Sequence, residues 1–265
     1  MPTADVTTAA TRTAPGDQQQ PDLPGAVRAA LAGVDGPVVL IGDEPTAIAT
    51  LAAVRGLGRT VALGRDLRAA ADALPIKAGS VAAVVVLHRL HEVDDVDATL
   101  AGFVRILAPG GRVVVAANAL ADRRELRGLW TTAARDCGVV DPPPFLDDNA
   151  RFSLDHAQAW LTRHLSAVEV TPLRGTEHLD TAAVLALLRA QRPETAGVTW
   201  DLLASVVESR VRDAVADHGG FALSTLTGLA TGVLATTPEQ AADTGAAKPV
   251  KAAKAAGKTA SRKRK

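Results

Sequence analysis

Short apolar runs alternate with amphipathic stretches along the first half of the chain. Four runs of mostly apolar residues are expected to be strands, namely 38–41, 60–63, 81–87 and 112–116. Three stretches between or beside them are expected to be helices, namely 26–31, 46–54 and 96–107. Uninterrupted apolar runs are typical of strands that are buried on both faces. Strands that alternate with helices therefore predict right-handed βαβ units and a parallel sheet covered on both sides.

The second half of the chain has a different rhythm, dominated by helical periodicity. Its expected helices are 122–135, 154–164, 181–191 and 200–217, interrupted by a strand-like stretch at 168–170. Two further strands are predicted at 221–226 and 229–235. Because only two residues separate them, we expect these strands to form a hairpin.

Composition narrows the class of protein. The chain has 265 residues, of which 47% are hydrophobic and 22% charged, as in one large globular domain. Aromatic residues make up 3% and tyrosine is absent, which argues against a stacking platform for single-stranded nucleic acid. The first twenty residues lack the apolar segment of a signal peptide, and no stretch offers 18 uninterrupted apolar residues. We therefore expect a soluble, cytoplasmic protein without membrane contact.

Metal and disulfide chemistry find little support in the sequence. A lone cysteine, Cys137, excludes an intrachain disulfide, and we expect it to fill a small apolar gap. No histidine pair has the HxxxH or HExxH spacing of a metal site, so no metal is expected. Glu177 and Asp180, on either side of His178, are expected to satisfy local backbone groups and Arg174.

The net charge of zero conceals an uneven distribution. Residues 248–265 hold six lysines and two arginines without an acid, which leaves 21 basic against 29 acidic residues before them. The sequence thus predicts a disordered leader at 1–24, a folded domain at 25–236 and a disordered basic tail at 237–265. The segment from Lys248 to Lys265 is expected either to contact nucleic acid or an acidic partner, or to fold back on the acidic body.

A recognisable pattern spans residues 74–120. A Leu74-Pro75 turn precedes an apolar strand that ends in Leu87-His88, and a helix then leads to Pro109-Gly110-Gly111 and another strand. This pattern resembles the middle of class I S-adenosylmethionine-dependent methyltransferases of the small-molecule type. The resemblance covers about 38–235. It implies a Rossmann-like α/β fold with a seven-stranded, mostly parallel sheet, an antiparallel last strand, and a helical lid within 118–218.

The resemblance also assigns cofactor-binding residues, and here the chain departs from the family. An acid followed by Gly-x-Gly-x-Gly is the family's pattern, but of its glycines only Gly42 is present, with Leu40 in place of the acid. Glu44 and Thr46 replace the other two glycines. Asp43 is the remaining candidate for the ammonium group of S-adenosylmethionine. We therefore expect this cofactor to bind weakly or not at all.

Two further acids match the family's nucleoside contacts. Asp66, which follows the strand at 60–63, corresponds to the acid that binds the ribose hydroxyls, although a solvated strand-end aspartate is an equal alternative. Ala70 stands where the family has an acid for the adenine amino group, and Asp72 is its nearest substitute. The predicted cofactor set is Gly42, Asp43, Asp66 and Asp72.

His88 and His91 are the candidate catalytic residues. They follow the strand at 81–87, at the sheet edge where open α/β sheets bind ligands. A histidine there can take a proton from a hydroxyl, amine or thiol during methyl transfer. The alternative is that His88 only lines the pocket and His91 caps the next helix.

Two functions remain open from the sequence. The first is a divergent methyltransferase that acts on a small-molecule acceptor the sequence does not identify. The second is a catalytically inactive pseudo-methyltransferase that serves as a binding or regulatory module, with the basic tail as its contact to a partner. A nicotinamide dehydrogenase is excluded because residues 42–47 do not contain Gly-x-Gly-x-x-Gly.

Overall fold

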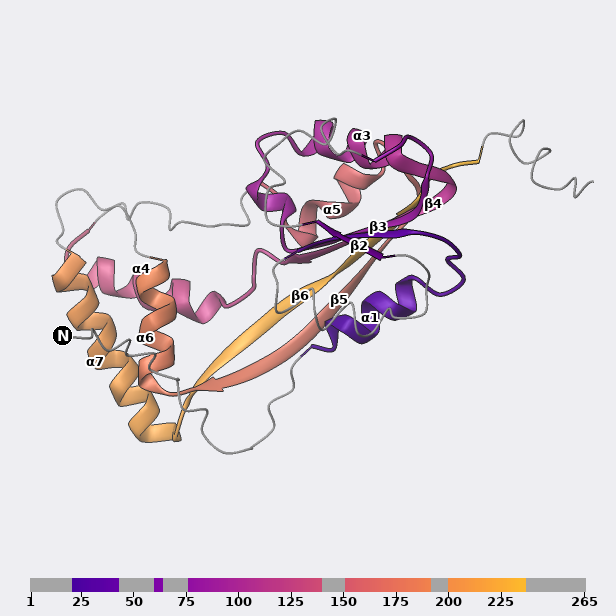
Figure 1. The fold of residues 1–265 in the computed structure, drawn as a ribbon. Coiled ribbons are helices and arrows are strands. Elements are labelled where there is room, and N and C mark those ends of the chain that lie inside the picture. Colours follow the sequence, from indigo (N-terminus) through magenta and orange to yellow (C-terminus); the bar gives the residue numbers. More distant parts are fainter. Residues whose placement is uncertain (1–20, 43–59, 64–75, 140–150, 192–199, 237–265) are drawn as a thin grey trace, which may run out of the picture. The chain divides into compact units, whose positions relative to one another are not determined.

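The sheet in this computed structural model holds six strands in the order β2-β1-β3-β4-β6-β5 (Figure 1). The structure describes residues 21–42, 60–63, 76–139, 151–191 and 200–236. Apart from Thr236, all of them belong to one unit, Met1–Ala235. The strands are β1 (Val38–Gly42), β2 (Thr60–Leu63), β3 (Val81–Leu87), β4 (Leu107–Asn118), β5 (Ser166–Leu179) and β6 (Phe221–Val233).

Strand directions give a mixed sheet. β1 to β4 run parallel to one another, whereas β6 is antiparallel to both β4 and β5. The predicted Rossmann-like α/β arrangement and the antiparallel last strand are thereby confirmed. The described part of the chain forms six strands rather than the seven expected, because the strands predicted at 221–226 and 229–235 are one strand, β6. The expected helix at 46–54 falls outside it.

Helices cover both faces of the sheet, as the buried strands require (Figure 1). In β1, Val39 and Ile41 join a core with α3 (Val96–Ile106) and α5 (Leu154–Leu161). The alternate residues, Val38 and Leu40, join a second core with α1 (Leu23–Ala30). Because successive strand side chains point to opposite faces, one apolar run supplies both cores.

Helix α1 begins earlier than the sequence predicts. Its first residue is Leu23, and the side chain of Asp22 caps it by accepting a hydrogen bond from the Gly25 amide at 2.9 Å. Asp at the N-cap satisfies one of the amides that a helix start leaves unpaired. Residues 22–24, assigned to the leader, therefore belong to the folded unit.

The predicted hairpin at 221–226 and 229–235 is wrong. These residues form the single 13-residue strand β6, which pairs along its length with the 14-residue strand β5. Gly228 does not turn the chain: a Cβ there would lie 2.5 Å from the Thr171 carbonyl oxygen and 2.6 Å from Leu154 Cδ2, so this position requires glycine for close packing. Its partner in β5 is Pro172, which is tolerated because β5 is an edge strand.

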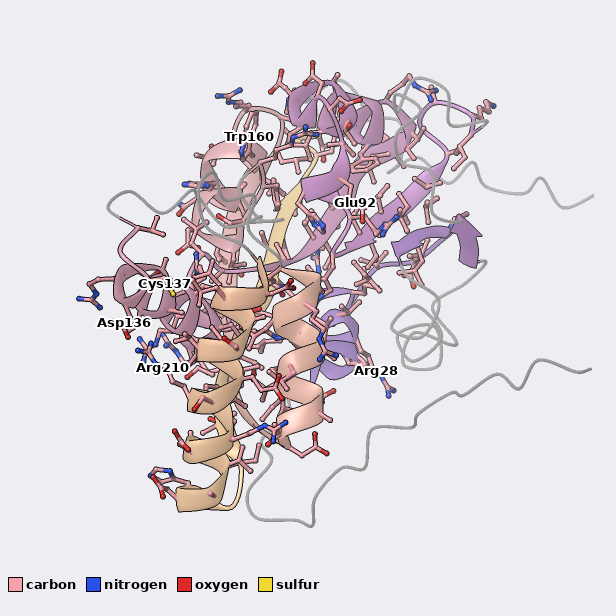
Figure 2. All side chains as sticks on the ribbon, turned by 90° about the vertical axis from the view of Figure 1, so that its left-hand side faces the viewer. Arg28, Glu92, Asp136, Cys137, Trp160 and Arg210 are labelled. Carbon is pink, nitrogen blue, oxygen red and sulfur yellow. The ribbon has the colours of Figure 1, made fainter. Side chains whose placement is uncertain are left out.

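Three helices of the expected lid form a third core. They are α4 (Arg124–Asp136), α6 (Thr181–Ala190) and α7 (Trp200–His218), which pack around the fully buried Trp130. An ion pair between Asp136 and Arg210 joins α4 to α7, and Cys137 packs at the margin of this core as expected (Figure 2). Two other elements within 118–218 are not part of this core: α5 packs against the sheet, and β5 is its edge strand. A covering role for the three helices stays a prediction.

The end of α3 and the glycine conformation agree with the sequence, but the strand expected at 112–116 is part of the longer β4, which begins at Leu107 and includes Pro109-Gly110-Gly111. α3 ends at Ile106, and Gly110 adopts a φ of 76°, the left-handed conformation expected for the Pro-Gly-Gly turn.

None of the described helices combines the length and the apolar composition that a membrane crossing requires.

Candidate functional site

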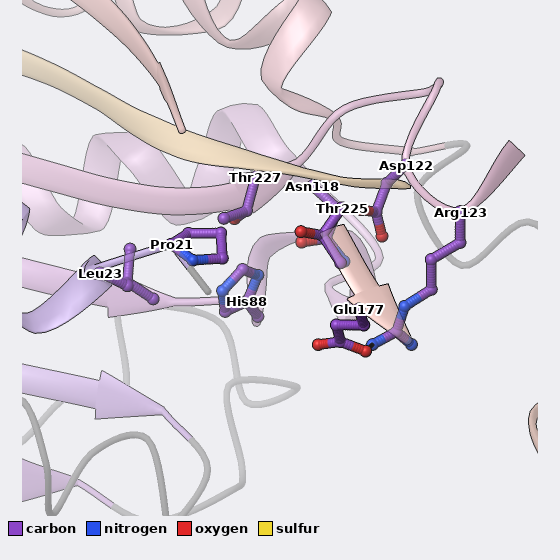
Figure 3. A pocket seen from close by; sticks show the side chains of 9 residues that line it. All are labelled: Pro21, Leu23, His88, Asn118, Asp122, Arg123, Glu177, Thr225 and Thr227. Carbon is purple, nitrogen blue, oxygen red and sulfur yellow. Dashed lines mark ion pairs between the residues drawn. The ribbon is translucent and has the colours of Figure 1, made fainter. Parts of the chain in front are cut away.

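A polar cavity of about 300 Å³ lies at the carboxyl ends of β3 and β4 (Figure 3). Its lining comes from the start of α1, the ends of β3 and β4, the turn after β4, and the paired strands β5 and β6. The lining residues are Pro21, Leu23, His88, Asn118, Asp122, Arg123, Glu177, Thr225 and Thr227. This is the edge at which parallel α/β sheets bind ligands. We call it the polar cavity.

His88 reaches the polar cavity through an unusual backbone conformation. It directly follows β3, has a φ of 51°, and donates its amide to the Ala116 carbonyl at 3.0 Å. Left-handed φ values are uncommon outside glycine, and they cluster at functional sites when the surrounding structure holds them. The imidazole lines the cavity near Pro21 and Leu23 (Figure 3).

Three carboxylates fix the turn that forms one wall of the cavity. Asp122 Oδ1 accepts the Leu226 amide at 2.7 Å, and Glu125 accepts the Ser224 hydroxyl at 2.6 Å. A third, Asp155, accepts the Leu120 amide at 2.7 Å. These bonds tie the segment after β4 to β6 and α5, so the wall is preorganised.

Helix α4 starts two residues later than predicted because of this wall. The sequence placed its start at Asp122, but Asp122 uses its side chain on β6 and Arg123 has a φ of 49°. A left-handed residue interrupts a right-handed helix. The helix therefore begins at Arg124, and Asp122 and Arg123 are left to line the cavity.

Charge in the polar cavity is predominantly negative. Asp122 is half-buried, and loss of hydration raises the pKa of its carboxyl, with nearby Glu177 adding to the rise. The guanidinium of Arg123 lies 4.0 Å from the Glu177 carboxylate (Figure 3). Within the described part of the chain Asp122 makes no ion pair. The lining therefore holds two carboxylates and one guanidinium, with Arg127 as a second guanidinium near Asp122.

Two threonines of β6 give the cavity its hydroxyl groups. Thr227 donates its hydroxyl to the Ala117 carbonyl at 3.1 Å. Thr225 is only 9% exposed, and its Oγ1 has no hydrogen-bond partner among the described residues. A buried hydroxyl without a partner is energetically unfavourable, and such an atom in a cavity wall calls for an explanation.

The structure separates the two candidate catalytic histidines. His88 lines the polar cavity, whereas His91 lies outside its lining, within the short helix η2 (Leu90–Glu92). Its Nε2 is 3.8 Å from a Glu92 carboxylate oxygen. Capping by His91 is wrong, because α3 is capped by Asp95, whose side chain accepts the Ala98 amide at 2.9 Å.

The described end of β1 does not fit the cofactor contacts that the resemblance implies. Leu40, in the position of the acid, is 1% exposed within the α1-facing core. A Cβ on Gly42 would lie 2.8 Å from Leu87 Cβ, so packing against β3 already requires this glycine. The other predicted cofactor residues, Asp43, Asp66 and Asp72, lie outside the described residues. Their assignment stays a prediction.

Several cavity residues were missed by sequence reasoning. Asn118 ends the parallel strand β4 and Asp122 lies in the turn after it, on the same edge as His88, which is a signal that the sequence contained. Glu177 was expected beside Arg174, but it faces Arg123 instead. The local role predicted for Asp180 is confirmed, because its side chain accepts the Ala183 amide at 2.7 Å at the start of α6.

Comparison with known proteins agrees with this architecture. Residues 26–115, about a third of the chain, match the family model described as a methyltransferase domain. No curated protein matches the chain. A structure described as a type II methyltransferase from Anaeromyxobacter dehalogenans aligns with a TM-score of 0.53 and 16% identity, over 82% of this chain and 99% of that one.

Two further solved structures are more distant in shape. One is described as a methyltransferase from Bacillus halodurans, with a TM-score of 0.49 and 11% identity over 80% of this chain and 98% of that one. The other is phosphoethanolamine N-methyltransferase 2 from Haemonchus contortus with S-adenosylhomocysteine, with a TM-score of 0.41 and 12% identity over 80% and 52%. The domain match confirms the resemblance to class I S-adenosylmethionine-dependent methyltransferases, and the Anaeromyxobacter structure shows their fold.

Proposed function

We propose that this chain is a divergent S-adenosylmethionine-dependent methyltransferase that acts on a small molecule held in the polar cavity. The observation that carries the proposal is the coincidence of a methyltransferase-domain match with a polar cavity at the ligand edge of the same sheet. S-adenosylmethionine would supply the methyl group. The chain's own task is to bind and orient the acceptor, which accounts for much of the rate of such transfers.

Within this proposal His88 is the general base. Its imidazole lines the cavity, its backbone is held by Ala116, and a histidine titrates near neutral pH. Asn118 and Thr227, which are paired across β4 and β6, give the acceptor polar neighbours. His91 lies outside the lining and has no part in the proposed chemistry.

Binding and turnover test the proposal separately. Calorimetry with S-adenosylmethionine should give a dissociation constant closer to millimolar than to micromolar, because β1 lacks the acid and the glycine cradle. Release of S-adenosylhomocysteine should then depend on an added acceptor. His88→Ala is expected to lower turnover roughly 10²-fold.

His91→Ala is the matched control for that variant, since the two histidines are three residues apart. It should leave turnover within about twofold of the natural chain. Equal loss in both variants would remove the assignment of His88 as the base. Loss in neither would leave His88 as a lining residue of the cavity.

The pseudo-methyltransferase is the second candidate. The burial of Leu40 in an apolar core and the packing role of Gly42 favour it, since neither residue needs a cofactor for its identity. Under this alternative the segment from Lys248 to Lys265 recruits nucleic acid or an acidic protein. Absence of S-adenosylmethionine binding at millimolar concentration, with the protein folded, would favour this reading over methyl transfer.

A further inference from the structure

We propose that the polar cavity recognises its small-molecule ligand through an ammonium group, with the Asp122 carboxylate as the counter-ion. The inference deepens the proposed function, on which it rests, by naming the class of acceptor as a small amine. The ammonium is the anchoring group, and the claim concerns binding.

The Asp122 carboxylate loses hydration on folding without gaining enough opposite charge to offset that loss. It is half-buried and, within the described residues, accepts one hydrogen bond, from the Leu226 amide. Neighbouring guanidinium groups do not offset its loss of hydration, because the pKa of the carboxyl is raised in spite of them. A buried carboxylate in this condition gains free energy when a cation is placed beside it.

Charge in the rest of the cavity selects against an anion. Arg123 is the lining group that an anion would need, but its guanidinium already faces Glu177 at 4.0 Å. An incoming anion would have to compete with that carboxylate and would meet Asp122 as a second like charge. Among the groups that line the cavity, a cation meets two carboxylates and one guanidinium, which is a net attraction.

The size and the hydroxyl groups restrict the amine further. A cavity of about 300 Å³ is at the lower end of ligand-binding pockets, so the ligand is small. The buried Thr225 hydroxyl has no partner among the residues that the structure describes, and a second polar group on the ligand would supply one. The cavity therefore fits a short amine that carries another hydrogen-bonding group.

Three probes of matched size test the role of charge. Ethanolamine, ethylene glycol and glycolate are titrated into ¹⁵N-labelled protein without S-adenosylmethionine, and amide chemical shifts are followed. Ethanolamine should shift the amides of Leu226 and its neighbours in β6 saturably, with a dissociation constant of about millimolar. The neutral and anionic probes should bind at least tenfold more weakly.

Variants assign the effect to Asp122. Asp122→Asn keeps an oxygen for the Leu226 amide and should weaken ethanolamine binding at least tenfold. Asp180→Asn is the matched control, because Asp180 accepts a backbone amide at the same 2.7 Å but belongs neither to the cavity lining nor to the three carboxylates that fix the wall. It should leave the affinity unchanged. Glu177→Gln should weaken binding severalfold, and it provides a second test if Asp122→Asn fails to fold.

Several outcomes overturn the inference. They are equal binding of glycolate or ethylene glycol, unchanged affinity in Asp122→Asn, and no saturable shift with any probe. Because the titration needs no cofactor, failure of the amine inference can be distinguished from failure of the proposed methyl transfer. Ethanolamine binding without S-adenosylmethionine binding would retain the amine site and reject methyl transfer, and the reverse result would do the opposite.

Discussion

Thr225 and Thr227 offer a paired test of the polar cavity through protein stability. The two residues are two positions apart in β6, so their side chains lie on the same face, and both line the cavity. The Thr227 hydroxyl donates to Ala117 at 3.1 Å, whereas the Thr225 hydroxyl has no partner among the described residues. Substitution of each by valine keeps the shape and the strand preference and removes only the hydroxyl.

The two substitutions should have opposite signs. Thr225→Val removes a buried polar atom that has no partner in the described part of the chain. Burial of such an atom costs about 1–3 kcal/mol, so we expect a gain of about 1 kcal/mol. Thr227→Val removes a hydrogen bond whose net value is about 1 kcal/mol, so we expect a loss of that size. In a domain of this length the resulting difference of about 2 kcal/mol separates the two Tm values by about 4–8 °C.

Thermal and urea unfolding of both variants, without added ligand, measure this difference. A loss of stability in Thr225→Val similar to that in Thr227→Val would show that the Thr225 hydroxyl is already satisfied in the ligand-free protein. The Thr225 hydroxyl would then need no ligand group to complete its hydrogen bonding. The slope of the unfolding free energy against urea concentration should match that of the natural chain. Such a match would show that neither substitution changes the surface exposed on unfolding.

Three further predictions follow from charge and packing. Because the pKa of Asp122 is raised in the folded state, its contribution to stability is present below its unfolded pKa of 3.8 and lost as pH rises through the folded pKa. Asp122→Asn should therefore gain stability relative to the natural chain as pH rises from about 4 to about 7. A constant difference in Tm between the two proteins across that range would show that burial does not raise this pKa. A hydrogen bond from His164 at 3.0 Å lowers the pKa of Asp97, so the stability that Asp97 contributes is present above its unfolded pKa and lost as pH falls through its folded pKa. The Asp97→Asn variant should therefore lose less stability than the natural chain in an acid titration. Identical acid unfolding curves for the two proteins would contradict the role of His164. Deletion of residues 248–265 should leave Tm nearly unchanged and abolish any salt-dependent affinity for duplex DNA in a binding titration, whereas a large loss of stability would place the tail within the fold.

The sequence predicted the parallel part of the sheet well because burial on both faces leaves an unambiguous signal. The strand expected at 81–87 is β3 without a change in its ends, since polar residues bound seven apolar ones. The strand at 168–170 was far too short, because β5 is an edge strand with mostly half-buried and exposed residues over its 14 positions. Periodicity detects burial, and an edge strand provides little of it.

The sequence allowed only those residues of the polar cavity to be predicted that lie at the end of a parallel strand. His88 follows an apolar run, and its place at the ligand edge could be inferred from the chain alone. Glu177 and Thr225 come from the antiparallel pair β5 and β6, and their approach to Asp122 depends on long-range strand pairing. The hydrogen bonds between Glu125 and Ser224 join residues 99 positions apart. No local pattern contains such a contact.

Gly228 connects the fold to the site. The sequence suggested a hairpin at this position, but the lack of a side chain lets β6 run straight beneath Leu154 and beside Thr171. Only an uninterrupted β6 brings the Leu226 amide to Asp122 while its other half pairs with β4. With a turn at Gly228, Asp122 would lose the amide that holds it, and Thr225 would leave the wall. The same glycine that was misinterpreted as a break in the strand is thus a requirement for the carboxylate-lined cavity.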